Sequence, residues 1–375
     1  MGIFILKAYY WFMQYVLRVG FRIGRITKIW HHFIEILRID LRTYSRLCHG
    51  VNLSKKQLKE IDSYWSRFVK VRPFSHAFYT EKTGLFSPLY LPDSTYFFCI
   101  DQFYNSWDAA KYLDNKSMYP RMFNGIKLPR MIACRKNGYW FNEDADPISM
   151  HEVINLVMSV EESFIKKATE SLGGKGVYYF CPGKHTRGEL MQILDGINCD
   201  IVVQEGIRQN CVMALLNPSS VNTLRLLSLL KKDGSVKIYS VIVRMGIGEA
   251  KVDNASSGGI TCGVLPDGHL KSIAFNPLGV RFEEHPTTHI QFGQFVIPNY
   301  QEIRYKIEKL HLQVPHFRMI SWDVAIDELN EPVLIEANLC DGELDFHQLN
   351  NGPLFGEDTD EILSEVFNTG NVIRR

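Results

Sequence analysis

The chain has 375 residues, of which 46% are hydrophobic and 22% are charged, and its formal net charge is +1 at pH 7. This composition is typical of a folded globular protein of two or three domains, and it excludes a disordered, collagenous or coiled-coil chain. The low net charge argues against a general nucleic-acid binder, because neutralising phosphates requires a surplus of Lys and Arg. The eight cysteines form no Cys-x-x-Cys pair, so we expect reduced thiols and a cytoplasmic protein.

Positive charge is concentrated at the amino terminus. Residues 1–47 carry a local charge of +6, and the other 328 residues sum to −5. Only ten uncharged residues separate Lys7 from Arg18, too few for a membrane-spanning helix, and no cleavage site for a secretory signal follows. Arg18, Arg22 and Arg25 recur at helical spacing, which predicts a basic amphipathic segment. Two interpretations stay open: the segment packs on the protein body or a second subunit, or it contacts the inner face of the cytoplasmic membrane.

The middle of the chain predicts a small lobe of mixed helices and strands. Helical spacing runs from Ser54 to Val71, polar turns follow, and another helix is expected to begin near Ser106 or Asp108. The next elements, in order, are a strand pair over 126–141 with its turn at 136–138, a helix over 149–162, a strand over 163–168, a glycine-rich loop over 171–176, a strand over 177–180, a helix over 187–197 and a strand over 200–207. This succession predicts an α+β lobe rather than a doubly wound sheet.

Residues 219–282 are predicted to be mostly β, with strands over 223–230, 236–248 and 259–275 and turns at 232–234 and 266–268. A helix over 303–314 precedes two strands within 318–339 that are joined by a turn at 327–331. The expected division is a helical segment over 1–50, a second region over 51–150, a small lobe over 151–210 and a large lobe over 211–375.

The strongest chemical signal lies on the last two predicted strands. Glu336 and Asn338 are two residues apart, so their side chains leave the same face of one strand, and Asp323 lies on the preceding antiparallel strand. Three oxygen-bearing side chains on one face form a candidate Mg²⁺ site, because Mg²⁺ prefers carboxylates, waters and phosphates. The alternative is a solvated strand face.

Two further segments are weaker signals when taken alone. The loop that contains Ser171, Gly173, Gly174, Lys175 and Gly176 has glycines that would let backbone N–H groups approach a phosphate, although a tight hairpin is the alternative. It is not a P-loop, because a strand follows it. The strand that ends in Gln204, Glu205 and Ile207 could present hydrogen-bonding groups to a flat base or to a ribose hydroxyl.

The order of these pieces resembles the ATP-grasp superfamily. Within it, the chain is most similar to the sugar-transfer-associated ATP-grasp proteins encoded with bacterial surface-polysaccharide machinery, and more loosely to the α-L-glutamate ligase-like enzymes. The segments that carry the resemblance are LLNPSSVNTLRLLSLL, VIVRMGIGEAKVDNASSGGITCGV, HPTTHIQFGQFVIPNY and SWDVAIDELNEPVLIEAN. The resemblance covers roughly residues 95 to 345. It implies an ATP-grasp fold, in which two α+β lobes hold the nucleotide between them.

The resemblance also implies roles for individual residues. Lys116 matches the first ATP lysine, and Lys166 matches the second phosphate lysine, with its neighbour Lys167 as the rival for that role. The glycine-rich loop described above, with Gly173, Gly174 and Gly176, matches the phosphate lid. Gln204, Glu205 and Ile207 match the segment that binds adenine.

Further matches concern the reacting groups. Arg225 and Arg244 match arginines near the transferred phosphoryl group, where cationic donors stabilise developing charge. Asn254, after Asp253, matches the segment that closes on the acceptor, and Asp323, Glu336 and Asn338 match the metal ligands. For His285, contact with substrate and a packing or capping role both stay open.

The resemblance implies a ligase that uses ATP and Mg²⁺, with Mn²⁺ as a substitute metal. A carboxylate would attack the γ-phosphate to give an acylphosphate, and an amine, or else a hydroxyl or thiol, would displace the phosphate. The expected partners are therefore a small-molecule or glycan carboxylate and an amine acceptor, in the modification of bacterial cell-surface polysaccharide. The alternatives are an ATP-grasp kinase and a nucleotide-binding scaffold of a glycan-assembly complex at the membrane. Oligomeric state stays open, with a dimer among the options.

Overall fold

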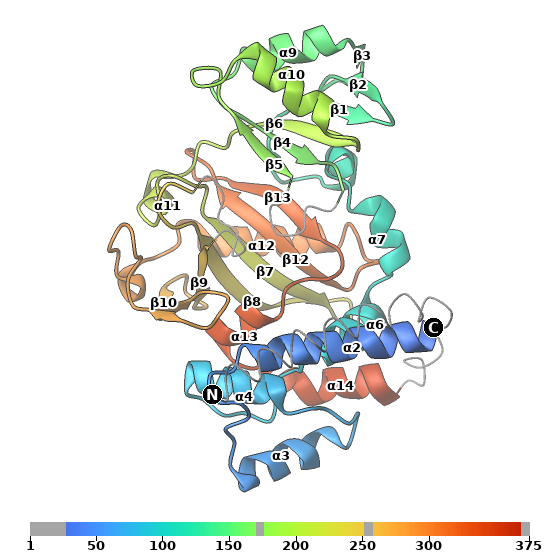
Figure 1. The fold of residues 1–375 in the computed structure, drawn as a ribbon, viewed down its shortest axis with the longest axis vertical. Helices are drawn as coiled ribbons and strands as arrows, with labels where there is room; N and C mark the ends of the chain where they lie inside the picture. Colours follow the sequence, from blue (N-terminus) through green and yellow to red (C-terminus); the bar gives the residue numbers. More distant parts are fainter. Residues whose placement is uncertain (1–27, 170–175, 251–257, 369–375) are drawn as a thin grey trace. The chain divides into compact units, whose positions relative to one another are not determined.

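The computed structural model describes residues 28–169, 176–250 and 258–368. The chain divides into two compact units (Figure 1). Unit 1 comprises Met1–Tyr104, Leu278–Val280 and Glu343–Arg375, and unit 2 comprises Asn105–Pro277 and Arg281–Gly342. The division runs through segments far apart in the chain, because the carboxyl-terminal helices pack with the amino-terminal ones. The basic amphipathic segment predicted from the sequence lies outside the described residues as far as residue 27.

The described elements of unit 1 are helices. They are α2 (Lys28–Ser45), α3 (Lys55–Trp65), α4 (Phe74–Thr83), α5 (Asp93–Thr95), the π-helix η1 (Tyr96–Asp101), α6 (Gln102–Tyr104), α13 (Asp345–Asn351), η6 (Gly356–Asp358) and α14 (Thr359–Asn368). The helix expected from Ser54 is confirmed as α3, whose N-cap Ser54 and N3 residue Gln57 form a capping box. The polar turns expected after Val71 are wrong, because α4 occupies that place. Five consecutive residues of α4, from Ser75 to Tyr79, are buried, so this helix lacks the one-sided apolar pattern that a sequence reveals.

Buried polar pairs, and not apolar contacts alone, hold helix α2 against the other helices of unit 1. The Thr43 hydroxyl donates to Asp93 Oδ2 at 2.7 Å, and the Ser94 hydroxyl donates to Asp40 Oδ1 at 2.6 Å. Just beyond the helix, Arg46 Nη1 bonds to Asp345 Oδ2 at 2.9 Å. The guanidinium of Arg46, one of the cations that give residues 1–47 their positive charge, is thus held inside the unit.

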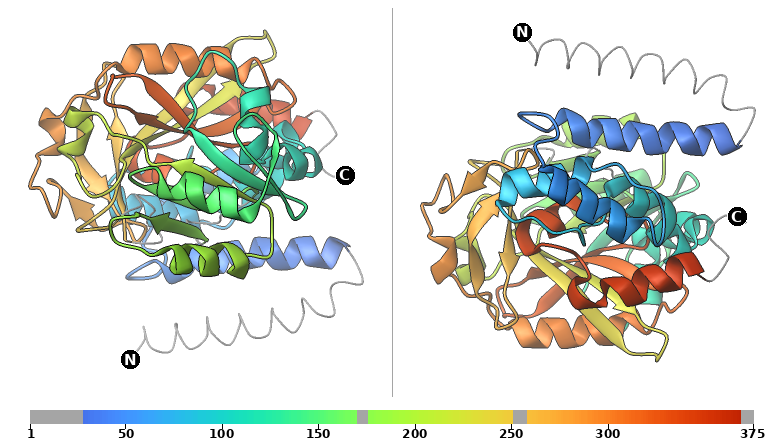
Figure 2. Two further views of the ribbon diagram at one scale, coloured as in Figure 1. Left: turned by 90° about the horizontal axis from the view of Figure 1, so that it is seen from above. Right: turned by 90° about the horizontal axis from the view of Figure 1, so that it is seen from below.

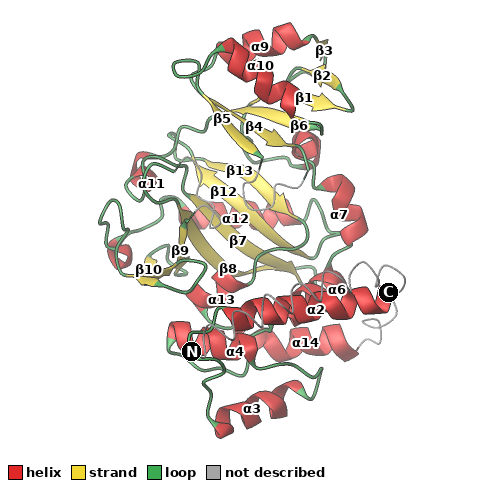
Figure 3. Cartoon of the chain, viewed as in Figure 1, coloured by secondary structure: helices red, strands yellow, loops and turns green. Residues whose placement is uncertain are grey.

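Unit 2 contains two antiparallel sheets (Figure 3). The first has six strands in the order β3-β2-β1-β6-β4-β5: β1 (Met131–Lys136), β2 (Tyr139–Phe141), β3 (Pro147–Ile148), β4 (Ser163–Lys167), β5 (Val177–Phe180) and β6 (Ile201–Glu205). Helices α9 (Met150–Met158) and α10 (Arg187–Gly196) cover one of its faces, where their apolar side chains form a core with Ile165 and Val203. Capping boxes start both helices, at Ser149 and Thr186.

The second sheet has seven strands in the order β11-β10-β9-β8-β7-β12-β13. The strands are β7 (Thr223–Leu230), β8 (Val236–Met245), β9 (Ile260–Val264), β10 (Leu270–Phe275), β11 (Arg281–Phe282), β12 (Met319–Ile326) and β13 (Pro332–Asn338). Helix α12 (Tyr300–His311) lies along one face (Figure 2), where Ile303 and Ile307 pack with Leu226 and Trp322. Because side chains alternate along a strand, the odd-numbered neighbours Arg225 and Asp323 project from the face opposite α12.

Short helices complete unit 2: α7 (Trp107–Leu113), η2 (Lys116–Met118), α8 (Tyr119–Met122), α11 (Cys211–Ala214) and η5 (Phe292–Gln294). Most elements expected from the sequence are confirmed, including α7, which begins after its N-cap Ser106. All eight cysteines are free thiols. Among the described residues, no helix is long and apolar enough to cross a bilayer.

Candidate active site

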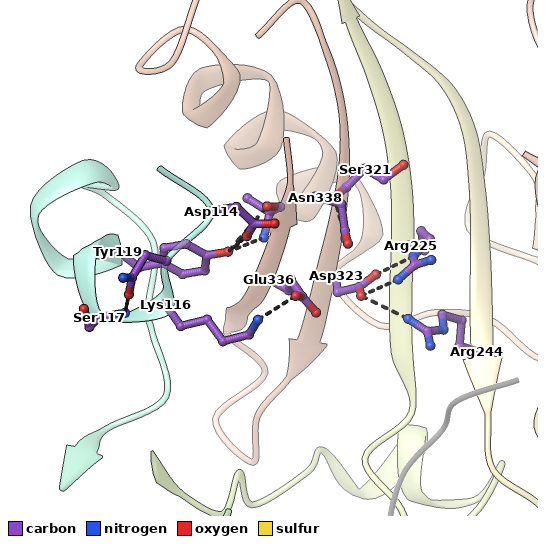
Figure 4. Close-up of polar contacts among 12 residues, drawn as sticks. Asp114, Lys116, Ser117, Tyr119, Arg225, Arg244, Ser321, Asp323, Glu336 and Asn338 are labelled. Atoms are coloured by element: carbon purple, nitrogen blue, oxygen red, sulfur yellow. Dashed lines mark hydrogen bonds and ion pairs between the residues drawn. The ribbon is translucent and has the colours of Figure 1, made fainter. Parts of the chain in front are cut away.

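A buried cluster of opposite charges lies on the face of the seven-stranded sheet that points away from α12. Arg225 on β7 donates to both oxygens of Asp323 on β12, from Nε and from Nη2, each at 2.7 Å. Arg244 on β8 adds a third bond from Nη1 to Asp323 Oδ2 at 3.0 Å. Figure 4 shows both guanidinium groups turned toward this carboxylate. Burial raises the pKa of Asp323, but the two arginines outweigh burial and hold it below its ordinary value.

A β-bulge brings Glu336 opposite Asp323. Close to the turn that joins β12 and β13, Val324 pairs with Leu334. Regular antiparallel pairing would then place Ile335 across from Asp323. The register shifts at this point, and Glu336 pairs with Asp323 instead. An extra residue in one strand moves every later side chain to the other face. The predicted juxtaposition of Asp323 and Glu336 therefore holds, and it depends on this local irregularity.

Lys116 reaches the same cluster from a different part of the chain. Its Nζ donates to Glu336 Oε1 at 2.6 Å, and its side chain is only 2% exposed. Its backbone N–H bonds to the carbonyl of Ala168, which follows β4 in the six-stranded sheet. One residue thus joins both sheets. Burial lowers the pKa of Lys116, but the Glu336 carboxylate outweighs this effect and the pKa lies above its ordinary value, so the amine stays charged.

Asn338 is oriented by its neighbour. Its Nδ2 donates to the Ser321 carbonyl at 3.1 Å, and since a carbonyl can only accept, the Oδ1 of Asn338 is turned away from that contact. Glu336 and Asn338 leave the same face of β13 and so fit a hard cation that binds oxygen. Asp323 is less available, because it already accepts three hydrogen bonds from guanidinium groups. Its role as a metal ligand stays a prediction, while its contacts make it the counter-ion of two arginines.

The six-stranded sheet offers a second polar surface on the face opposite α9 and α10. Lys166 and Phe164 on β4 share this face with Gln204 on β6, because Phe164 pairs with Gln204. Lys166 Nζ lies 5.7 Å from the centroid of the Phe164 ring. Its rival Lys167 has the opposite parity and leaves the other face, and Gly176 lies against its aliphatic stem. The alternation of the strand therefore favours Lys166 as the lysine on the Gln204 side.

Gln204 is buried, and its Oε1 has no hydrogen-bond partner among the described residues. Such an acceptor is expensive to leave unpaired, which is typical of a place that a ligand donor fills. The next residue, Glu205, bonds through its N–H to the Arg130 carbonyl at 3.0 Å and accepts from the Arg130 side chain. Ile207 follows at the start of the connection to the larger sheet.

Several predicted residues cannot be placed. Ser171, Gly173, Gly174, Lys175 and Asn254 lie outside the described residues, and of the predicted phosphate loop only Gly176 is described, with a φ of +87°.

For His285, the sequence left open a contact with substrate and a packing or capping role. The side chain is fully buried, its Nε2 lies 2.9 Å from the Gly246 carbonyl, and its Nδ1 accepts from the N–H groups of Thr287 and Thr288. Because both ring nitrogens hold the backbone of adjacent loops, the packing and capping interpretation fits this histidine.

The sequence interpretation missed Tyr119 and Ser321. Tyr119 hydrogen-bonds to β13 beside Glu336, and Ser321 lies across from Asn338 with its Oγ buried and without a partner among the described residues. For Ser321 a signal existed, since it precedes Asp323 by two residues on the same strand. No local pattern marks Tyr119, because its contact spans 218 residues of chain.

The chain matches a known protein family in sequence. Its residues 100–362 match the model of the sugar-transfer associated ATP-grasp family, which is more than half of the chain. No curated protein matches in sequence. Similar solved structures include the ADP complex of purK, N5-carboxyaminoimidazole ribonucleotide synthetase (9% identity, TM-score 0.38, 61% of this chain and 45% of that one). Others are the ATP-grasp ligase PsnB with a precursor variant, Mg and ADP (10%, 0.42, 70% and 61%) and the D-alanine-D-alanine ligase from Coxiella burnetii (10%, 0.38, 74% and 59%).

In each of these three structures, the chain spans less than two thirds of the other protein's length. The chain belongs to the sugar-transfer associated ATP-grasp family and has the ATP-grasp fold.

Proposed function

We propose that the protein is an ATP- and Mg²⁺-dependent ligase that joins a carboxylate to an amine through an acylphosphate. The observation that carries the proposal is the cluster on the seven-stranded sheet, where the cations Lys116, Arg225 and Arg244 meet the carboxylates of Asp323 and Glu336. Fixed, buried cations suit a triphosphate and the charge that develops during phosphoryl transfer.

The nucleotide would lie against residues of both sheets. Gln204 Oε1, buried and unpartnered among the described residues, could accept from the exocyclic amine of adenine. Lys166 and Lys116 would bind phosphates, for which Lys116 has to exchange its bond to Glu336. That exchange frees Glu336 Oε1, and Glu336 and Asn338 would then hold the metal. Mg²⁺, when bound, neutralises phosphate charge and orients the transferred group.

The protein's own chemical work would be positioning and charge neutralisation. Arg225 and Arg244 keep fixed directions because Asp323 holds both, so these guanidinium groups need little reorganisation when negative charge develops nearby. Such preorganised donors lower the barrier without a nucleophilic side chain. The family name supports a role in sugar transfer, and we propose an acidic glycan or an amino acid as the carboxylate, with an amine as acceptor.

The test is ADP release from Mg-ATP across a panel of uronic acids and amino acids, with and without amines. Glu336→Gln is the blank, and Glu331→Gln, an exposed carboxylate on the turn before β13, is the matched control. ADP that forms only when an acid and an amine are both present, with a product mass equal to their sum less water, supports a ligase.

Two results would contradict the proposal. A phosphorylated hydroxyl compound as the product indicates a kinase. Tight ATP binding without turnover across the whole panel, unchanged when membrane lipids and lipid-linked glycans are added, indicates a nucleotide-binding scaffold.

A further inference from the structure

The strand that carries Glu336 and Asn338 is the last strand of its sheet. Among the described strands, β13 pairs with β12 alone, so its other edge has backbone groups without a partner from those strands. Two residues of unit 2 outside the sheet, Lys127 and Tyr119, hydrogen-bond to this edge. The Lys127 carbonyl accepts from the Leu334 N–H at 2.9 Å, and the Tyr119 hydroxyl accepts from the Ala337 N–H at 3.1 Å.

The bond from Tyr119 falls between the two candidate metal ligands. Ala337 is the residue between Glu336 and Asn338, so a hydroxyl bound to its N–H fixes the backbone from which both side chains leave. A phenol has one donor and can also accept. The hydroxyl of Tyr119 can donate to the Ala337 carbonyl or to Asp114 Oδ1, each 3.4 Å away (Figure 4).

Tyr119 is rigidly held. It is 3% exposed, and its ring lies edge-on to Phe123 at 5.2 Å, while Phe123 in turn contacts Trp322 on β12. Burial raises the pKa of Tyr119 well above its ordinary value, with Asp114 and Glu336 adding to the effect, so the hydroxyl keeps its proton at neutral pH.

Tyr119 also follows Lys116 by three residues. The segment from η2 to α8 therefore contacts β13 twice, through Lys116 at the Glu336 side chain and through Tyr119 at the Ala337 backbone. This short segment therefore fixes the orientation of the Glu336 side chain and also its distance from Lys116.

We propose that Tyr119 is a positioning residue: its hydroxyl replaces a neighbouring strand at the edge of β13 and holds Glu336 and Asn338 in the geometry that binds the metal and the phosphates. The consequence for metal binding rests on the proposed function, whereas the consequence for the strand does not. Groups that orient metal ligands typically change metal affinity by about 10- to 100-fold when they are removed.

The experiment compares Tyr119→Phe with Tyr300→Phe. Both tyrosines belong to the same apolar core, but Tyr300 lies at the start of α12, where its side chain lies against Gly268. Amide hydrogen exchange of the peptide that covers β13 is expected to be at least about fivefold faster in Tyr119→Phe and unchanged in Tyr300→Phe. Equal exchange in the wild type and in Tyr119→Phe would overturn the proposal.

The second readout is the Mg²⁺ concentration that half-saturates ADP binding. It should rise by about tenfold in Tyr119→Phe, while ADP affinity in the presence of EDTA stays as in the wild type. Faster exchange with an unchanged Mg²⁺ requirement would overturn the link to the metal. A wild type that does not bind ADP at any Mg²⁺ concentration contradicts the proposed function instead, and the exchange measurement still decides the role of Tyr119 at the strand.

Discussion

Replacing Asp323 by Asn is expected to destabilise unit 2 strongly. The Asp323 side chain is 6% exposed and those of Arg225 and Arg244 are 7% and 8% exposed, so water can solvate none of them well. Removing one partner of a buried ion pair typically costs about 3–5 kcal/mol, because the remaining charge has lost its counter-ion. Asn keeps the shape and one acceptor, which places the expected loss near the lower end, at about 3 kcal/mol, or roughly a hundredfold in the unfolding equilibrium.

Urea unfolding followed by tryptophan fluorescence measures this loss, since Trp322 is fully buried next to Asp323. With a slope of about 3 kcal/mol per molar urea, the midpoint should fall by about 1 M. Arg244→Met is the companion variant. If the charges are coupled, the double variant with Asp323→Asn should lose less than the two single losses added together, by at least about 1 kcal/mol. A midpoint within 0.1 M of the wild type (on the order of 0.3 kcal/mol), or strictly additive losses, would refute the reasoning.

The pH dependence of this contribution has a definite sign. The arginines hold the pKa of Asp323 below its ordinary value, so the folded state keeps the carboxylate charged where the unfolded chain has begun to bind a proton. The stabilisation is complete above the ordinary pKa of an aspartate and is lost as the pH falls through the lower, folded pKa. The difference in stability between the wild type and Asp323→Asn should therefore be constant near neutrality and shrink in acid.

Three further changes test other parts of the structure. Ser228→Ala removes the buried hydroxyl that accepts from Trp322 Nε1 at 2.7 Å and should destabilise the protein by about 1–3 kcal/mol in urea, because the indole N–H stays buried without a partner. Burial raises the pKa of Asp93 to about 6, so the contribution of Asp93 to stability should fall by about 3 kcal/mol as the pH rises from about 4 to about 6, and Asp93→Asn should lack this decline. Gly206→Ala would place a Cβ against the Glu162 carboxylate, and displacing this side chain from its bond with the Tyr179 hydroxyl should lower the urea midpoint by an amount equivalent to about 1 kcal/mol.

Each of these three predictions has an outcome that would contradict it. An unchanged midpoint in Ser228→Ala would mean that the indole N–H finds another acceptor. A pH slope that persists in Asp93→Asn would assign the slope to another group. For the glycine, Gly196→Ala is the matched control, since nothing lies within 4 Å of a Cβ there. Equal midpoints for the two alanine variants would show that Glu162 moves aside freely.

How far the sequence could predict the fold depended on the range of the contacts involved. The turn at 232–234 and the paired strands around it are local, and the alternation in TLRLLSLL and SWDVAI indicates which face of its own strand Arg225 or Asp323 leaves. Capping residues likewise marked the starts of α3 and α7. Helix α4 was missed because it is buried on every side and so has no apolar stripe.

The candidate site shows the same limit more sharply. The sequence by itself determined which residues carry charge and that Glu336 and Asn338 leave the same face of one strand, since these follow from residue type and from a period of two. Only the tertiary structure decided that a bulge at Ile335 turns Glu336 toward Asp323, and that Lys116 and Tyr119 meet a strand more than 200 residues further along the chain. Register and long-range pairing depend on packing and on hydrogen bonds at the strand edge, and these physical determinants leave no periodic trace in the sequence.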